Sequence, residues 1–405
     1  MPGDIRRGKT RGPFPTWVRV MDGSAALLTL PPVTPAYVQT RTSDGRPETI
    51  AVLHRADSLI ADHRYAEALE VLGEVSLPAV SAPDLALRIL FSESWARMYV
   101  GELDAAVASL ERARALAEGP AFTDIDRAEA MFRLACCRLK VGKVSNAIAL
   151  FTAALALAER GVAGDLLSAR ILDWRSRALQ VQREWEAAQA DAERSLELAE
   201  SVGDHRLAAL ALMQCSLVAE RRGDPRVARL YAERSRQLAR ETGDRQTEAR
   251  VLNNLGGLSY LLGEPEKAVA YLKDAFAISL EVGNEADSAQ AVSSLAQVHL
   301  RCGAPQLAEE QARHALSILA ERDDYLDERG NAHLVLGRAL LEQERDAEAL
   351  TELAAAEWAF ETFGSGSHVA ATWVAQADAY RRADDTDAAM TLYRRAAEAL
   401  QDFHF

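Results

Sequence analysis

The chain has 405 residues, and its 60 acidic side chains outnumber its 46 basic ones, which gives a formal net charge of −14. This balance disfavours general binding to nucleic acids, because neutralising phosphates requires a basic surface. The four cysteines form no CxxC pair, and no apolar run has the length of a membrane span or the pattern of a signal peptide, so we expect a cytoplasmic protein with reduced thiols and no membrane partner.

Residues 1–47 differ in composition from the rest of the chain. They hold seven of the thirteen prolines and carry seven Arg or Lys residues against three Asp. The prolines interrupt regular helix, and a segment of this composition cannot bury much apolar surface. The sequence therefore predicts a flexible or extended N-terminal arm, followed by one elongated domain over residues 48–405.

A three-point spacing recurs nine times after this arm. A small residue is followed twelve positions later by Ala and nineteen positions later by another small residue, with Val75 as the one departure. The first positions are Ala56, Ser94, Ala135, Ser176, Ser216, Gly256, Ala296, Gly337 and Ala377. Because successive repeats lie 38 to 41 residues apart, the pattern predicts a solenoid of stacked units.

Each repeat has the sequence pattern of two helices. Gly263 followed by Pro265 indicates a helix end and the start of the next helix, because Gly adopts the left-handed conformation at a C-terminus and Pro suits a first helical turn. Gly243 followed by Asp244 indicates the junction between repeats, since Asp caps a helix N-terminus. Apolar residues recur with the helical period between these junctions, so we predict an all-α chain.

The spacing resembles the tetratricopeptide repeat, and the best match is residues 249–282. The usual repeat of that family has about 34 residues. The longer repeats of this chain are similar to those of kinesin light chains, cell-polarity adaptors and bacterial regulators that sense peptides. The resemblance covers roughly residues 48–402. It implies a right-handed solenoid of about nine helix-turn-helix repeats with a concave groove that binds a protein or peptide.

The groove that the resemblance implies is rich in basic residues. Four positions on the first helix of each repeat share one side, and basic residues exceed acidic ones there although the chain is acidic. Four of the basic residues, Lys140, Arg221, Arg301 and Arg381, lie at C-terminal helix ends, where the helix dipole favours a cation. The bias therefore has two interpretations, an anionic ligand or helix-end electrostatics.

Particular side chains on this side favour peptide binding. Arg170, Trp174 and Arg177 share a helix face, which is typical of a surface that anchors a side chain or a terminal carboxylate. In the peptide-binding relatives, an Asn two residues before the small position grips the backbone of the peptide, and the equivalent residue is Asn254, although the other repeats lack this Asn. The complete set of predicted contact residues is Arg133, Arg170, Trp174, Arg177, Gln214, Arg250, Asn253, Asn254 and Arg338.

The sequence contains no pattern that supports catalysis or metal binding. The eight histidines are dispersed, and His299 with Cys302 makes only a two-residue set. The glycine clusters at 256–257 and 364–366 follow no predicted strand, which argues against a phosphate-binding loop. We predict no enzymatic activity, no cofactor and no metal site.

These observations favour a non-enzymatic scaffold or regulatory adaptor that binds an extended, acidic or carboxylate-bearing segment of a protein or peptide. One alternative is self-assembly into a homo-oligomer through the repeat ends, because solenoid ends normally need polar caps and this chain ends with Phe403 and Phe405. A nucleic-acid-associated regulator is a further alternative, which the acidic outer surface disfavours.

Overall fold

The structure is a computed structural model that describes residues 47–61, 64–75, 82–161, 164–320, 325–363 and 366–401. Over these ranges the chain forms eighteen helices and no strand, which confirms the predicted all-α class. The helices are α1 (Pro47–Ala61), α2 (Tyr65–Gly73), α3 (Pro83–Tyr99), α4 (Leu103–Ala117), α5 (Asp124–Lys140), α6 (Val144–Ala158), α7 (Asp165–Val181), α8 (Trp185–Ser201), α9 (His205–Arg221), α10 (Pro225–Glu241), α11 (Arg245–Leu261), α12 (Pro265–Glu281), α13 (Glu285–Arg301), α14 (Pro305–Ile318), α15 (Leu326–Leu341), α16 (Asp346–Phe363), α17 (Gly366–Arg382) and α18 (Thr386–Gln401).

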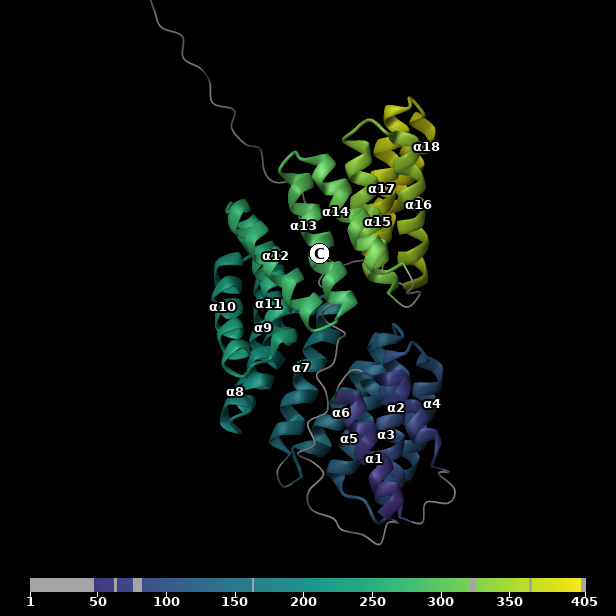
Figure 1. Cartoon of the computed structure of the whole chain (residues 1–405), viewed down its shortest axis with the longest axis vertical. Coiled ribbons are helices and arrows are strands. Elements are labelled where there is room, and N and C mark those ends of the chain that lie inside the picture. Colours follow the sequence, from purple (N-terminus) through teal and green to yellow (C-terminus); the bar gives the residue numbers. More distant parts are fainter. Residues whose placement is uncertain are drawn as a thin grey trace, which may run out of the picture.

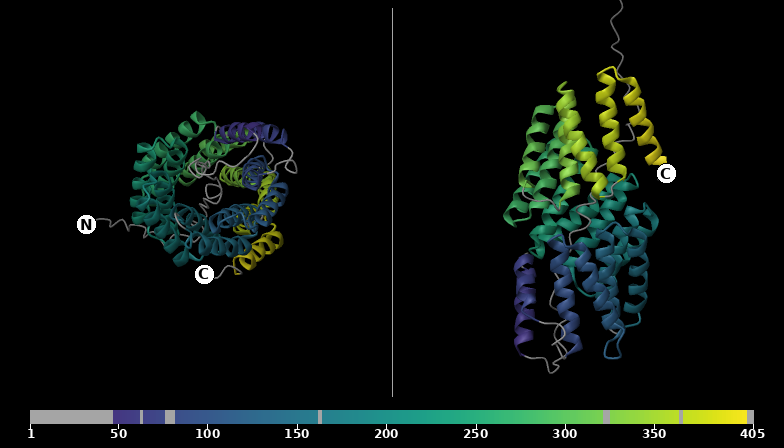
Figure 2. Two further views of the ribbon diagram at one scale, coloured as in Figure 1. Left: turned by 90° about the horizontal axis from the view of Figure 1, so that it is seen from below. Right: turned by 90° about the vertical axis from the view of Figure 1, so that its right-hand side faces the viewer.

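Consecutive helices pack as pairs, from α1 with α2 to α17 with α18 (Figure 1). Each odd-numbered helix also contacts the odd-numbered helices of neighbouring repeats, whereas the even-numbered helices mainly contact the helices directly before and after them. In Figure 1, α8 and α10 lie outside α9 and α11, and the view along the long axis shows the helices arranged in a ring (Figure 2). The odd-numbered helices therefore line the inside of a superhelix, and we call their inward side the inner face.

The junctions between helices have the predicted chemistry. Gly263 adopts a φ of 80°, and Pro265 begins α12. Between two repeats, the Asp244 carboxylate accepts a hydrogen bond from the backbone N–H of Thr247 at 3.0 Å. These contacts end one helix and satisfy a backbone donor at the start of the next.

The small residues of the repeat are buried where the two helices of a pair touch. The Ser176 hydroxyl donates a hydrogen bond to the carbonyl of Ala188, twelve positions later, at 2.8 Å. At Gly256, an added Cβ would lie 2.5 Å from Cγ of Leu272. The recurring spacing thus records the positions where helices approach too closely for larger side chains.

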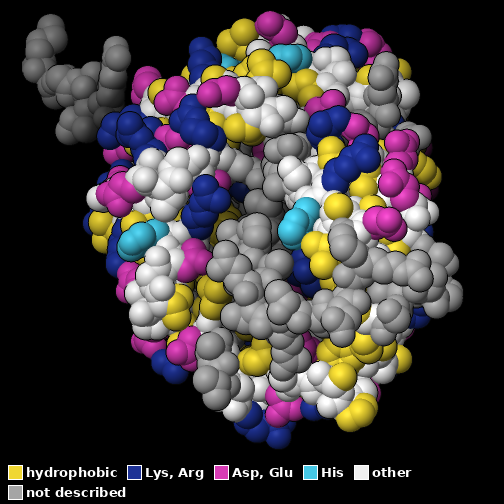
Figure 3. Space-filling model, turned by 60° about the horizontal axis from the view of Figure 1, so that its bottom comes forward, with side chains coloured by type: hydrophobic (Ala, Val, Ile, Leu, Met, Phe, Trp, Pro, Cys, Tyr) yellow, Lys and Arg dark blue, Asp and Glu magenta, His cyan; other side chains and the backbone are white. Residues whose placement is uncertain are grey.

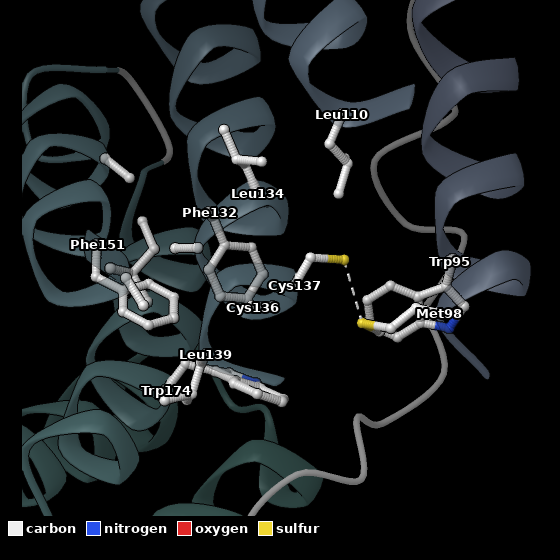
Figure 4. Close-up of a cluster of buried hydrophobic side chains, with 14 of the residues drawn as sticks. Trp95, Met98, Leu110, Phe132, Leu134, Cys136, Cys137, Leu139, Phe151 and Trp174 are labelled. Atoms are coloured by element: carbon white, nitrogen blue, oxygen red, sulfur yellow. Dashed lines mark hydrogen bonds between the residues drawn. The ribbon is translucent and has the colours of Figure 1, made fainter. Parts of the chain in front are cut away.

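Figure 4 shows the hydrophobic cluster around α5, in which buried side chains of neighbouring repeats pack together. The rings of Phe132 and Phe151 are 6.1 Å apart between centroids, and both side chains are fully buried. Beside them, the Cys137 thiol donates to the Met98 sulfur at 3.4 Å. Burial raises the pKa of Cys137 to about 12, so this residue packs as a neutral thiol.

Two sequence predictions lie outside the described residues. Residues 1–46 of the expected arm are not described, and α1 begins at Pro47, the last residue assigned to the arm. Phe403 and Phe405, on which the self-assembly alternative rests, are not described either. In the part of the chain that is described, no helix has the length and apolar composition needed to cross a membrane.

Three junctions carry a non-glycine residue in the left-handed conformation, and they predict a stabilising substitution. Glu344 has a φ of 60°, at a position where other repeats have glycine. Glu344→Gly is expected to raise the free energy of unfolding by about 0.5–1 kcal/mol, because only glycine adopts this conformation without steric cost. Thermal unfolding followed by circular dichroism measures the change. Glu342→Gly is the matched control, since Glu342 has a φ of −65° and its replacement should destabilise.

Candidate functional site

The nine predicted contact residues all lie on odd-numbered helices. They are Arg133 on α5, Arg170, Trp174 and Arg177 on α7, Gln214 on α9, Arg250, Asn253 and Asn254 on α11, and Arg338 on α15. Even-numbered helices cover the outer side of the odd-numbered helices. The half-exposed side chains of the odd-numbered helices therefore lie on the inner face. Seen from the α1–α6 end, the molecule has acidic and basic side chains interspersed over its outside (Figure 3).

Arg133 of α5 and Arg170 of α7 share one carboxylate, and each lies against an aromatic ring. Glu129 accepts a hydrogen bond from Nε of Arg133 at 2.7 Å and pairs with Arg170 at 3.4 Å. Arg133 lies 4.7 Å from the ring centroid of Phe91, and Arg170 lies 4.9 Å from that of Phe132. Burial opposes ionisation of Glu129, but the two arginines outweigh it and hold its pKa below the usual value. Both guanidinium groups therefore have partners within the protein, although one carboxylate shared by two arginines leaves the cluster with a net positive charge.

Trp174 and Arg177 do not form the exposed anchoring surface that their spacing suggested. Their exposed fractions are 2% and 1%, and the Arg177 guanidinium lies 4.8 Å from the centroid of the indole. Nη2 of Arg177 lies 2.8 Å from the Asp173 carboxylate, whose pKa is raised by burial although Arg177 opposes the shift. The face of α7 that carries both residues packs against neighbouring helices and is not exposed to solvent.

Arg250 is buried as well, with an exposed fraction of 5%. Its Nε donates to the Asp287 carboxylate at 2.9 Å, which joins α11 to α13. The same carboxylate accepts a hydrogen bond from the Asn284 amide at 2.9 Å. Arg250 therefore links two repeats and is not an exposed groove residue.

The amides of α9 and α11 form a different environment. Gln214 is fully buried, and its side-chain oxygen accepts a hydrogen bond from the Gln180 amide at 3.1 Å. Asn253 and Asn254 are half-buried, and the Asn254 amide donates to the Ser216 hydroxyl at 3.0 Å. Within the described residues, Oδ1 of Asn253 is buried without a hydrogen-bond partner. An orphaned buried carbonyl oxygen is costly, and a ligand N–H would satisfy it.

Two glutamines of α13 extend this surface. Gln290 and Gln297 are half-buried, occupy the helix positions that the sequence assigns to the inner face, and make no side-chain hydrogen bond to the described residues. Together with Asn253 and Asn254 they make up what we call the amide surface. Its members combine donors and acceptors without charge, which suits contact with a peptide backbone.

Arg338 lies beyond the amide surface on α15. Its Nη2 donates to the backbone carbonyl of Ala371 at 3.3 Å. Burial and the nearby Arg301 guanidinium lower its pKa to about 10, with Asp378 acting in the opposite direction. Arg338 is thus the one predicted arginine for which the described residues supply no paired carboxylate.

Sequence reasoning missed Gln290 and Gln297 as candidates. Both fall at inner-face positions of the repeat, but attention to charge favoured the arginines over neutral amides. The available signal was the change along the chain, from charged inner positions in α5 and α7 to Asn and Gln in α11 and α13. Among the described residues, no group of three or more His, Cys, Asp or Glu side chains could hold a metal ion.

The comparisons with known proteins agree with the fold. Residues 249–281 match the tetratricopeptide repeat family model, and no curated protein matches at a significant level. A Rap protein complexed with Competence and Sporulation Factor is similar, with a TM-score of 0.63 and 18% identity over 88% of this chain and 98% of that one.

Two further solved structures show the same fold. The Rap conjugation gene regulator of plasmid pLS20, in complex with the Phr* peptide, has a TM-score of 0.55 and 13% identity over 78% of this chain and 94% of that one. Aspartyl phosphate phosphatase F from Bacillus subtilis has a TM-score of 0.57 and 13% identity over 87% of this chain and 92% of that one. Because a phosphatase is among them, the absence of enzymatic activity stays a prediction.

Proposed function

Since this chain is a tetratricopeptide-repeat protein built as a solenoid of long helix pairs, we propose that it is a regulatory scaffold that binds an extended peptide segment on its inner face. The fold makes an inner face available, and the structure of one similar protein of this fold is a complex with a peptide. The proposed binding site is the amide surface of α11 and α13.

Within the described residues, Oδ1 of Asn253 is buried and has no hydrogen-bond partner, and this observation carries the proposal. An extended peptide offers one N–H and one carbonyl per residue, and side-chain amides can pair with both. The inner arginines of α5, α7 and α11 support the site indirectly. Because Glu129, Asp173 and Asp287 already pair with them, these arginines stabilise the repeats that hold the amide surface in place.

The proposed segment lies extended across successive odd-numbered helices. Asn253 and Asn254 belong to α11, whereas Gln290 and Gln297 belong to α13, which packs directly against it. A backbone lying across both helices would meet an amide at each step. We propose that the preference for particular peptide sequences then comes from the ends of the bound segment, where charged side chains of the protein replace the amides.

Replacing the α11 amides is expected to weaken peptide binding by about tenfold or more, because each lost hydrogen bond contributes about 1 kcal/mol. The test compares wild-type protein with the Asn253→Leu and Asn254→Leu double variant. Both are immobilised and exposed to a pool of hexapeptides randomised at every position, and the retained peptides are identified by mass spectrometry. Titration of the retained peptides then gives the dissociation constants.

Gln306→Leu is the matched control, because Gln306 is an exposed amide on α14, outside the inner face. We expect this variant to retain the same peptides with unchanged affinity. If wild-type protein enriches no peptide from the pool, or if the double variant binds as well as wild type, the proposal is wrong.

A further inference from the structure

Arg301 and Arg338 stand apart from the other arginines of the inner face. Arg301 lies in the last turn of α13 and Arg338 in the last turn of α15, and both are half-buried. Within the described ranges, no Asp or Glu lies at ion-pair distance from either guanidinium. Among the described residues, Arg301 lies 5.4 Å from the ring centroid of Tyr260, and Arg338 donates to the Ala371 carbonyl.

Other arginines of the inner face differ from Arg301 and Arg338, because they are ion-paired with carboxylates. Arg133 and Arg170 share the Glu129 carboxylate, whereas Arg177 and Arg250 each have a carboxylate of their own. The nearest acid that acts on Arg338 is Asp378, which instead accepts a hydrogen bond from the Tyr393 hydroxyl at 2.6 Å. Two partly desolvated cations of neighbouring repeats thus have no ion-paired carboxylate among the described residues.

Electrostatics makes this arrangement unfavourable in the absence of a ligand. Burial lowers the pKa of Arg301, with Tyr260 and Glu220 opposing, and Arg301 in turn helps to lower the pKa of Arg338. An anion between the two guanidinium groups would offset both the burial and the repulsion. Their planar donors match the two oxygens of a carboxylate.

We propose that Arg301 and Arg338 form a carboxylate-binding site at the α15 end of the amide surface. The proposal rests on the proposed function, because the carboxylate belongs to the segment whose backbone contacts the amide surface. The Tyr260 ring beneath Arg301 orients that guanidinium by a cation–π contact. This site gives the bound segment a direction, with its acidic group toward α15.

The geometry also sets the length of the segment. From α11 to α15 there are two steps between neighbouring odd-numbered helices, which amounts to about 16–20 Å at about 8–10 Å per step. An extended chain covers this distance with about five or six residues at about 3.3 Å each. A hexapeptide can therefore reach from Asn254 to Arg338.

The carboxylate has two sources, a C-terminal carboxyl group or an Asp or Glu side chain, and the test separates them. Two randomised hexapeptide pools are used, one with free carboxyl termini and one with amidated termini. If the C-terminus is the ligand, wild-type protein retains peptides from the free-carboxyl pool alone. If a side-chain carboxylate is the ligand, wild-type protein retains peptides from both pools, and these peptides carry Asp or Glu near one end.

The variants Arg301→Gln and Arg338→Gln are each expected to reduce binding of the retained peptides at least about tenfold. Arg226→Gln is the control. Arg226 is exposed on α10, so this substitution removes the same charge outside the inner face. Equal affinity of wild type and both inner variants would overturn this inference while leaving the proposed function intact.

A second measurement does not depend on peptide binding. The melting temperature is compared in sodium acetate and in sodium chloride at equal ionic strength, for wild type, the Arg301→Gln and Arg338→Gln double variant, and Arg226→Gln. We expect acetate to raise the melting temperature of wild type and Arg226→Gln more than that of the double variant. If the pools yield no peptide but this difference is present, the anion site stands and the proposed function fails. Equal shifts in all three proteins contradict the site.

Discussion

Arg250→Met is expected to lower the free energy of unfolding of the central repeats by about 3–5 kcal/mol. The substitution keeps an apolar side chain of similar length but leaves the Asp287 carboxylate, 2.9 Å away, buried without its cation. Among the described residues, the Asn284 amide is then the remaining side-chain hydrogen-bond donor to Asp287. From the sequence, Arg250 is predicted to be a contact residue of the groove, but its burial makes it a structural residue between two repeats.

The measurement is native-state hydrogen exchange of the α11 and α13 amides, because a solenoid unfolds by neighbouring repeats and a single global transition need not report the loss. The double variant Arg250→Met with Asp287→Leu provides the internal control. Replacing both partners removes the buried charge, so most of the lost protection should return. Undiminished protection in Arg250→Met would show that the pair contributes nothing to stability.

Phe151→Ala is expected to destabilise the N-terminal repeats by about 3–5 kcal/mol, since it leaves a cavity in a core that cannot collapse fully. The Phe151 side chain is fully buried and lies against Phe132 of the preceding helix (Figure 4). Chemical denaturation followed by the fluorescence of the buried tryptophans of this cluster measures the change.

Leu230→Ala is the control for the core variant. Leu230 is a large apolar residue of α10 with an exposed fraction of 65%, so its truncation should change the free energy of unfolding by less than about 0.5 kcal/mol. Similar losses in the two variants would indicate that the repeats do not share a tightly packed core around α5.

The helix pairs could be predicted from the sequence because their determinants are local. Ala188 and Gly256 sit at close contacts whose spacing recurs in every repeat, and Asp244 caps the helix that directly follows it. The pattern was less informative at Glu344, where the left-handed conformation is adopted without the expected glycine. There the neighbouring helices impose a backbone geometry that the residue itself does not favour.

The candidate site could be predicted only in part, because the partner of an inner arginine is distant in sequence. Arg250 and Asp287 are 37 positions apart, and Arg170 and Glu129 are 41 apart. Nothing in the local pattern distinguishes these paired arginines from Arg301 and Arg338. The helix-dipole interpretation of Arg301 described its own helix correctly, but it gave no information on the ring of Tyr260 or on the arginine of the following repeat.

The layered arrangement of the helices has a mechanical consequence. Neighbouring repeats are tied together on the inside by bonds such as Arg250 to Asp287 and Asn254 to Ser216, whereas the outer helices mainly contact their direct neighbours in the chain. Small rotations between successive repeats add up along a solenoid. A rearrangement of a few inner contacts near α11 therefore displaces the two ends of the molecule much farther than it moves the contacting atoms, and the curvature of the whole protein depends on the bonds along its inside.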